Sequence, residues 1–220
     1  MNHIDNKNHT EKINNIKSVN NNEAINNTGK IDYLEKINHI EHISRCQLIY
    51  DHPLYQAELV KIAGYESDRI FCRHTFEHFM DVARIAYIMN LEKEYKLSKE
   101  IIYAAALLHD IGRSRQYEDG TPHDEAGAAI ADEILTDCGF GDDVRNMIIA
   151  AIKSHRGSTH EGEIHESDKD TENTGHKEYA RDILATIIYK ADKASRQCFR
   201  CNAQKECNWS MEKRNLEINI

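Results

Sequence analysis

Proline and long apolar runs are what this sequence has least of. Its 220 residues include two prolines, Pro53 and Pro122, and this scarcity favours helices, because proline interrupts the helical hydrogen-bond ladder. No apolar run reaches the roughly 18 residues that a membrane-spanning helix needs, so we expect no contact with a membrane. The first residues lack the apolar core of a secretory signal. We therefore expect a cytoplasmic protein.

An excess of positive charge is also missing. The formal net charge is -9, with charged residues at 30% of the chain. A protein that binds the nucleic-acid backbone needs a basic face to release counterions, so a nucleic-acid partner is not expected. In a cytoplasmic chain the six cysteines are better interpreted as free thiols or metal ligands than as disulfides. The length is sufficient for one hydrophobic core.

Apolar periodicity predicts an all-α chain in three parts. Residues 1–30 are rich in asparagine and have no apolar stripe, which predicts a disordered leader. Residues 31–197 are predicted to form one domain with a polar loop at about 157–176, and residues 198–220 a cysteine-containing tail. The helices are predicted at 31–50, 53–63 with Gly64 as C-cap, 74–91, 99–109, 123–137, 143–154 with Asp142 as cap, and 177–197.

The stretch His109-Asp110-Ile111-Gly112 is the most informative feature. A histidine and an aspartate at the end of the apolar run 101–108 are costly to bury unless something satisfies them, and a bound cation would satisfy both. Almost every predicted core helix delivers one further ligand-type side chain from its apolar face or its end, and converging helices can aim such groups at one point. The resulting set of candidate metal ligands is His78, His109, Asp110, His123, His155 and Asp192.

Four imidazoles and two carboxylates suit a divalent transition metal (Fe, Mn, Co, Ni or Zn) rather than Ca or Mg. Six ligands are more than one ion needs if water and substrate must also bind, so two ions are expected. Asp110 has two oxygens and could bridge them. Metals roughly 3.5–4 Å apart can clamp a phosphate while they activate a water molecule.

These residues, with Val82-Ala83-Arg84 after His78 and with Ala191-Asp192-Lys193, resemble the HD superfamily of metal-dependent phosphohydrolases in its HDIG-type form. The order H…HD…H…H…D over about residues 70–197 is similar to that of the binuclear bacterial dinucleoside-tetraphosphate hydrolases. The sequence does not resemble the cyclic-di-GMP branch of the superfamily, because it lacks the tyrosine-proline signature of that branch.

The resemblance implies an all-α HD-domain helical bundle and hydrolysis of a phosphate ester or anhydride of a nucleotide or other small phosphorylated substrate. It also implies one metal on His78, His109, Asp110 and Asp192, and a second on Asp110, His123 and His155. Two other functions stay open, a di-iron oxygenase of the same superfamily and a non-catalytic nucleotide-binding sensor. The chain could form a homodimer.

Three further residues are predicted to act with Asp110. Arg113 follows Gly112 directly and Lys193 follows Asp192, so both are predicted to serve catalysis and to bind substrate phosphate. The alternative is a pair of solvated charges. His74, four residues before His78, is predicted to contact the substrate or a metal ligand, or else to be a capping or surface group. Solvated loop histidines are expected at His160, His165 and His176.

The tail has its own motif. Cys198 and Cys201 have the CxxC spacing of a thiolate metal site, Cys207 follows, and Cys72 is the candidate for a fourth zinc ligand. The alternative is a set of reduced cysteines, with Trp209 packing the tail onto the bundle. Basic residues make the tail suited to border an anionic substrate pocket, namely Arg196, Arg200, Lys205, Lys213 and Arg214.

Overall fold

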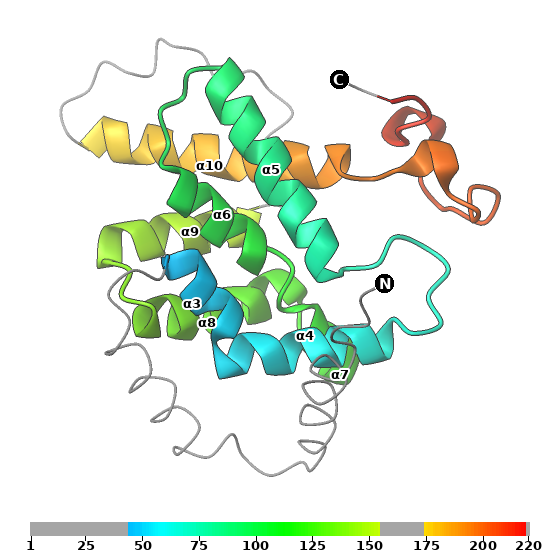
Figure 1. Ribbon diagram of the computed structural model, residues 1–220, viewed down its shortest axis with the longest axis horizontal. Helices are drawn as coiled ribbons and strands as arrows, with labels where there is room; N and C mark the ends of the chain where they lie inside the picture. Colours follow the sequence, from blue (N-terminus) through cyan, green and yellow to red (C-terminus); the bar gives the residue numbers. More distant parts are fainter. Residues whose placement is uncertain (1–43, 155–173, 219–220) are drawn as a thin grey trace, which may run out of the picture.

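The computed structural model describes residues 44–154 and 174–218, with 174–177 described by their backbone alone. All regular structure in these residues is helical, which confirms the predicted all-α class (Figure 1). The leader, residues 31–43 of the helix predicted at 31–50, and most of the polar loop lie outside the described residues. In the described part, the helix begins only at Arg45, because Ser44 is its N-cap with an extended backbone. The helices are α3 Arg45–Asp51, α4 Pro53–Tyr65, α5 Phe76–Glu92, α6 Lys99–Leu108, α7 Arg113–Asp119, α8 His123–Asp137, α9 Asp142–Ser154 and α10 Thr174–Ala194, with 3-10 turns η4 Cys198–Arg200 and η5 Met211–Lys213.

Helix α6 lies at the centre of the bundle, where α3, α5, α9 and α10 pack against it. Every residue from Ala104 to Leu108 is buried, and the three alanines in this run let neighbouring helices approach closely. The chain leaves the helix while still inside the core. His109 and Asp110 are therefore 0% and 2% exposed.

Helices α5 and α10 pack against each other as well as against α6. The apolar face of α5 includes the buried Phe79 and Val82, and His78 lies on that face one turn before Val82. Asp192 lies one turn after the buried Ile188 of α10. The helical period thus directs one imidazole and one carboxylate from two helices toward the end of α6.

Several predicted helix boundaries were wrong, and two of them concern the helices before the site. Helix α4 continues through Gly64 to Tyr65, and its C-cap is Glu66 at φ -98°, a backbone conformation that needs no glycine. Helix α5 begins at Phe76 rather than at His74, because Thr75 is the N-cap and its Oγ1 accepts a hydrogen bond from the backbone N–H of His78 at 3.4 Å. His74 therefore lies before the helix, although the helix was predicted to begin with it.

Helix α10 covers Thr174–Ala194 rather than 177–197, so His176, predicted in the polar loop, lies in the helix. The tail ends it, because the side-chain amide of Asn215 donates to the carbonyls of Lys193 (2.8 Å), Ala194 (3.3 Å) and Arg196 (2.8 Å). None of the described helices is both long and apolar enough to cross a membrane.

Candidate metal centre

Four ligand-type side chains from three elements meet at the end of α6. One potential ligand atom from each lies within 4.8 Å of those of the other three, and the four residues are His78, His109, Asp110 and Asp192. They are the residues that the resemblance assigned to a first metal. Two imidazoles and two carboxylates at this spacing can hold one transition-metal ion.

His109 is held in one orientation by the end of its own helix. Its Nδ1 lies 2.7 Å from the carbonyl oxygen of Ala106, which can only accept, so Nδ1 carries the proton. The other ring nitrogen, Nε2, lies 3.4 Å from Oδ2 of Asp110. Burial lowers the pKa of His109, but the charge of Asp110 outweighs this and raises it. A cation, either a proton or a metal ion, is therefore favoured between these two atoms.

His78 presents its Nε2 to the same place. The hydroxyl of Ser195 donates to the carbonyl of Asp192 at 2.8 Å and lies 3.2 Å from Nδ1 of His78, so it can accept from that nitrogen. Nε2 is then left 3.5 Å from Oδ1 of Asp192, buried and without a hydrogen bond in the described part of the chain. Burial lowers the pKa of His78 to about 4, which keeps the imidazole in the neutral form that binds metals. A metal ion would satisfy this nitrogen.

Asp110 makes different contacts with its two oxygens. Oδ2 lies 3.4 Å from Nε2 of both His109 and His74. Oδ1 lies 3.2 Å from Nε2 of His123 and 2.9 Å from Nε of Arg113. His123 is fully buried, and its Nδ1 lies 3.1 Å from Oε1 of Gln116. Asp110 thus has the arrangement that a bridging carboxylate needs. His155, the remaining ligand predicted for a second metal, lies outside the described residues.

Glu66 is a residue that sequence reasoning missed. Its buried carboxylate accepts from the backbone N–H of His74 at 2.7 Å and from the Tyr117 hydroxyl at 2.6 Å, and it lies 2.5 Å from Nδ1 of His74. Burial raises the pKa of Glu66, but the bonds from His74 and Tyr117 outweigh this and lower it to about 2. A carboxylate that orients an imidazole toward a metal centre is a common support. No sequence pattern indicates Glu66, because its contact with His74 depends on the course of the non-helical segment between α4 and α5.

The structure pairs both predicted phosphate ligands with carboxylates of the centre. Arg113 contacts Asp110, and its Nη1 donates to Gln116 at 3.0 Å. Lys193 donates to Oδ2 of Asp192 at 2.8 Å, with its ammonium 4.8 Å from the centre of the Tyr189 ring. In this arrangement both cations offset the negative charge of the candidate ligands.

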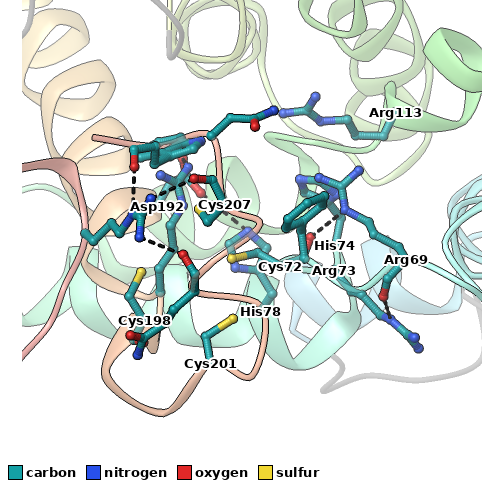
Figure 2. Close-up of a pocket in the computed structure, with 16 residues that line it drawn as sticks. Arg69, Cys72, Arg73, His74, His78, Arg113, Asp192, Cys198, Cys201 and Cys207 are labelled. Carbon is teal, nitrogen blue, oxygen red and sulfur yellow. Dashed lines mark hydrogen bonds and ion pairs between the residues drawn. The ribbon is translucent and has the colours of Figure 1, made fainter. Parts of the chain in front are cut away.

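A cavity of about 350 Å³ opens beside the four-ligand group (Figure 2). His74, His78 and Asp192 line it, so the candidate metal centre is accessible from this cavity. Its other walls come from the loop before α5 and from the tail. Five arginines line it, namely Arg69, Arg73, Arg113, Arg196 and Arg214. The basic tail residues Arg196 and Arg214 had suggested an anionic pocket, whereas Arg69 and Arg73 had no signal in the sequence.

Arg196 contacts both a candidate metal ligand and an aromatic ring of the tail. Its Nη2 donates to Oδ2 of Asp192 at 3.1 Å, and its guanidinium carbon lies 3.6 Å from the centre of the Trp209 ring. Its Nη1 is buried and has no hydrogen-bond partner among the described residues. Burial raises the pKa of Asp192, but Arg196, His109 and Lys193 outweigh this and lower it to about 2. The i, i+4 spacing of Asp192 and Arg196 could have indicated this pair.

Comparison with known proteins gives one family. The HD domain family matches residues 75–197, a range that includes all six candidate metal ligands. A protein of Clostridium beijerinckii described as "Uncharacterized protein" is 42% identical to this chain over 175 residues, which are 80% of this chain and 98% of that protein. No solved structure matches the chain.

Proposed function

Because this chain belongs to the HD domain family, we propose that it is a metal-dependent phosphohydrolase acting on a nucleotide or another small phosphorylated substrate. The observation that carries the proposal is the four-ligand group beside an arginine-lined cavity. Metal-ligand geometry supports hydrolysis, and the guanidinium groups support an anionic substrate. A cavity of about 350 Å³ is of a size that suits a small molecule.

The residues present fit a divalent metal. The unbonded Nε2 of His78 and the facing atoms of His109 and Asp110 are what a cation would satisfy. We propose that His78, His109, Asp110 and Asp192 hold one ion, and that Asp110, His123 and His155 hold a second. Such ions supply an activated water and neutralise charge on the phosphoryl oxygens.

The protein's own groups position the reactants. Ala106 and Ser195 set the ring orientations of His109 and His78, and Glu66 holds His74 toward Asp110. Such fixed ligands and dipoles need no reorganisation when charge develops on the substrate.

Arg196 is proposed as the main phosphate ligand. Its Nη1 is a buried donor without a partner in the described structure, and it belongs to a residue that lines the cavity. A phosphate oxygen there would satisfy that donor. The Trp209 ring covers the guanidinium and reduces its contact with water, which strengthens an electrostatic contact.

Arg113 and Lys193 remain predicted phosphate ligands. Each is paired with a carboxylate that we propose as a metal ligand, Asp110 and Asp192 respectively. A bound metal would supply the positive charge that these side chains now provide. They would then be available to the substrate.

The proposal is tested with protein loaded with Mn, Fe, Co or Ni and a panel of nucleotides and dinucleoside polyphosphates, with phosphate release as the measurement. We expect turnover of at least one substrate, lost in His109→Ala. The exposed Asp119→Asn variant serves as a control and should keep wild-type activity. Absence of turnover with every substrate, in protein whose metal content has been verified, would contradict the proposal.

A further inference from the structure

Four of the six cysteines line the same cavity. Cys72 lies in the loop between α4 and α5, whereas Cys198, Cys201 and Cys207 lie in the tail, and Figure 2 shows all four at this cavity. None of the four forms a disulfide. They lie outside the segment that the HD domain family matches, so the family does not account for them.

The tail has little apolar packing of its own. Between Ser195 and residue 218 its regular structure is two three-residue turns, and Ala203 is the one buried apolar residue described there. Phe199, Met211 and Ile218 are exposed. Segments that cannot bury enough apolar surface usually depend on disulfides or a bound metal. Since these cysteines form no disulfide, a bound metal is the other means by which they could hold the tail to the loop before α5.

Hydrogen bonds hold the backbone around the tail cysteines in place. Cys198 accepts a turn hydrogen bond from the backbone N–H of Cys201 at 3.1 Å, and the sulfur of Cys201 accepts from the N–H of Ala203 at 3.4 Å. The guanidinium of Arg214 donates to the carbonyl of Cys207 at 2.6 Å and to that of Trp209 at 2.6 Å. An N–H bond to sulfur stabilises a thiolate and tunes an iron–sulfur centre.

We propose that the thiolates of Cys72, Cys198, Cys201 and Cys207 bind an iron–sulfur cluster at the tail side of this cavity. Four soft thiolates select zinc or an iron–sulfur cluster. A tetrahedral zinc with Zn–S bonds of about 2.3 Å needs sulfurs only ~3.8 Å apart. Among the described residues, the group of ligand atoms that lie close enough together to hold one ion is the His/Asp group, and it includes none of these sulfurs. The wider spacing favours a cluster, whose several iron atoms separate the thiolates further.

The cluster would connect the tail to the loop before α5. Arg196, Trp209 and Arg214 form part of the cavity wall next to these cysteines. The cluster would therefore hold this arginine-containing wall of the cavity in place without itself taking part in hydrolysis. The site is independent of the proposed hydrolytic activity.

The test uses the full chain isolated anaerobically, before and after incubation with ferric iron, sulfide and a thiol reductant, which together supply both oxidation states of iron that clusters contain. Iron, acid-labile sulfide, zinc and visible absorption are measured. We expect iron and sulfide bound together, with the broad visible absorption of a cluster. Sulfide is the decisive readout, because iron alone could occupy the His/Asp centre.

Variants separate this site from the rest of the chain. Cys72→Ser and Cys201→Ser should lose most of the bound sulfide, whereas the control Cys46→Ser, whose sulfur lies near the carbonyl of Glu100, should retain it. His109→Ala should also retain sulfide, so a failure of the phosphohydrolase proposal leaves this one intact. Absence of sulfide in both wild-type preparations, unchanged sulfide in Cys72→Ser, or a single zinc ion that Cys201→Ser loses would overturn the cluster. Circular dichroism verifies that each variant is folded.

Discussion

Asp110 contacts two separate groups of side chains through its two carboxylate oxygens. Oδ2 faces His109 and His74, and Oδ1 faces His123 and Arg113. The sequence predicted a shared carboxylate because Asp110 has two oxygens, and the structure supplies the two different directions. At the scale of the residue, its removal should therefore affect both proposed metals.

We expect Asp110→Ala to lose both ions and all hydrolytic activity. His123→Ala should keep the first ion, since His78, His109 and Asp192 remain around it. Elemental analysis gives the number of ions per chain, with the exposed Asp119→Asn variant as control. Two ions retained by folded Asp110→Ala protein would refute the bridging role.

Glu66 supports a prediction about stability and pH. Its pKa in the folded protein is about 2, against an ordinary 4.5, so its contribution to stability is present above pH 4.5 and is lost as the pH falls toward 2. Glu66→Gln should destabilise the protein by about 2 kcal/mol at pH 7, because bonds to a buried charged acceptor are lost.

Urea unfolding at pH 7 and pH 3 measures this effect. The difference between wild type and Glu66→Gln should shrink at pH 3, since the wild-type carboxylate then loses its advantage over the amide. The control Glu118→Gln removes only exposed ion pairs and should change stability by less than about 0.5 kcal/mol. An equal difference at the two pH values would show that the charge of Glu66 is unimportant.

At the scale of the element, Gly112 determines how closely α7 approaches α8. A Cβ on Gly112 would lie 2.1 Å from the carbonyl oxygen of His123 and 2.3 Å from the backbone nitrogen of Gly127. These are backbone atoms, so the overlap can be relieved only by moving the helices apart. The glycine of the His109–Gly112 stretch therefore keeps His123 close to Asp110.

Gly112→Ala should destabilise the protein by about 3 kcal/mol or more through this overpacking. The matched control is Gly64→Ala in α4, where an added Cβ meets nothing within 4 Å. That substitution should stabilise by about 0.5–1 kcal/mol, because alanine is the better helix former. Denaturant unfolding measures both, and wild-type stability of Gly112→Ala would contradict the close approach.

Helix α7 illustrates what periodicity does not detect. The sequence Arg-Ser-Arg-Gln-Tyr-Glu-Asp has no apolar stripe, Ser114 is its one buried residue, and the sequence predicted no helix there. Contacts with distant residues stabilise it instead, including Arg115 with Glu58 at 3.1 Å and Tyr117 with Glu66 at 2.6 Å. Such contacts depend on how α4 folds back, which the local sequence does not contain.

At the scale of the whole molecule, an acidic chain gathers positive charge around one cavity. The chain carries a net charge of -9, yet five arginines line one cavity. A local positive potential in an acidic protein attracts anions to one place, and added salt screens this attraction.

Inorganic phosphate should therefore bind to the metal-loaded protein more weakly as ionic strength rises. Arg196→Gln should weaken binding about tenfold or more, as expected for the loss of a charged hydrogen bond. Arg200→Gln is the control, because this exposed tail arginine does not line the cavity in the described structure. Calorimetric titration gives the affinities, and unchanged affinity in Arg196→Gln would exclude it as a phosphate ligand.

The sequence by itself determined the all-α class, most helix positions and the set of candidate metal ligands. Helical periodicity shows which residues share a buried face, and polar ligand residues on such a face stand out. His78 and Asp192 could be recognised because each is one turn from a buried apolar residue. For the same reason, the helix predicted at 123–137 matches α8 in full.

Only the tertiary structure decided what surrounds those ligands. The support of His74 by Glu66, the pairing of Arg113 with Asp110, and the meeting of Cys72 with the tail cysteines all join segments with no shared periodicity. Periodicity reports the environment of one helix at a time. The cavity and its charge arise where loops and tail pack together, and that packing depends on contacts between residues far apart in the chain.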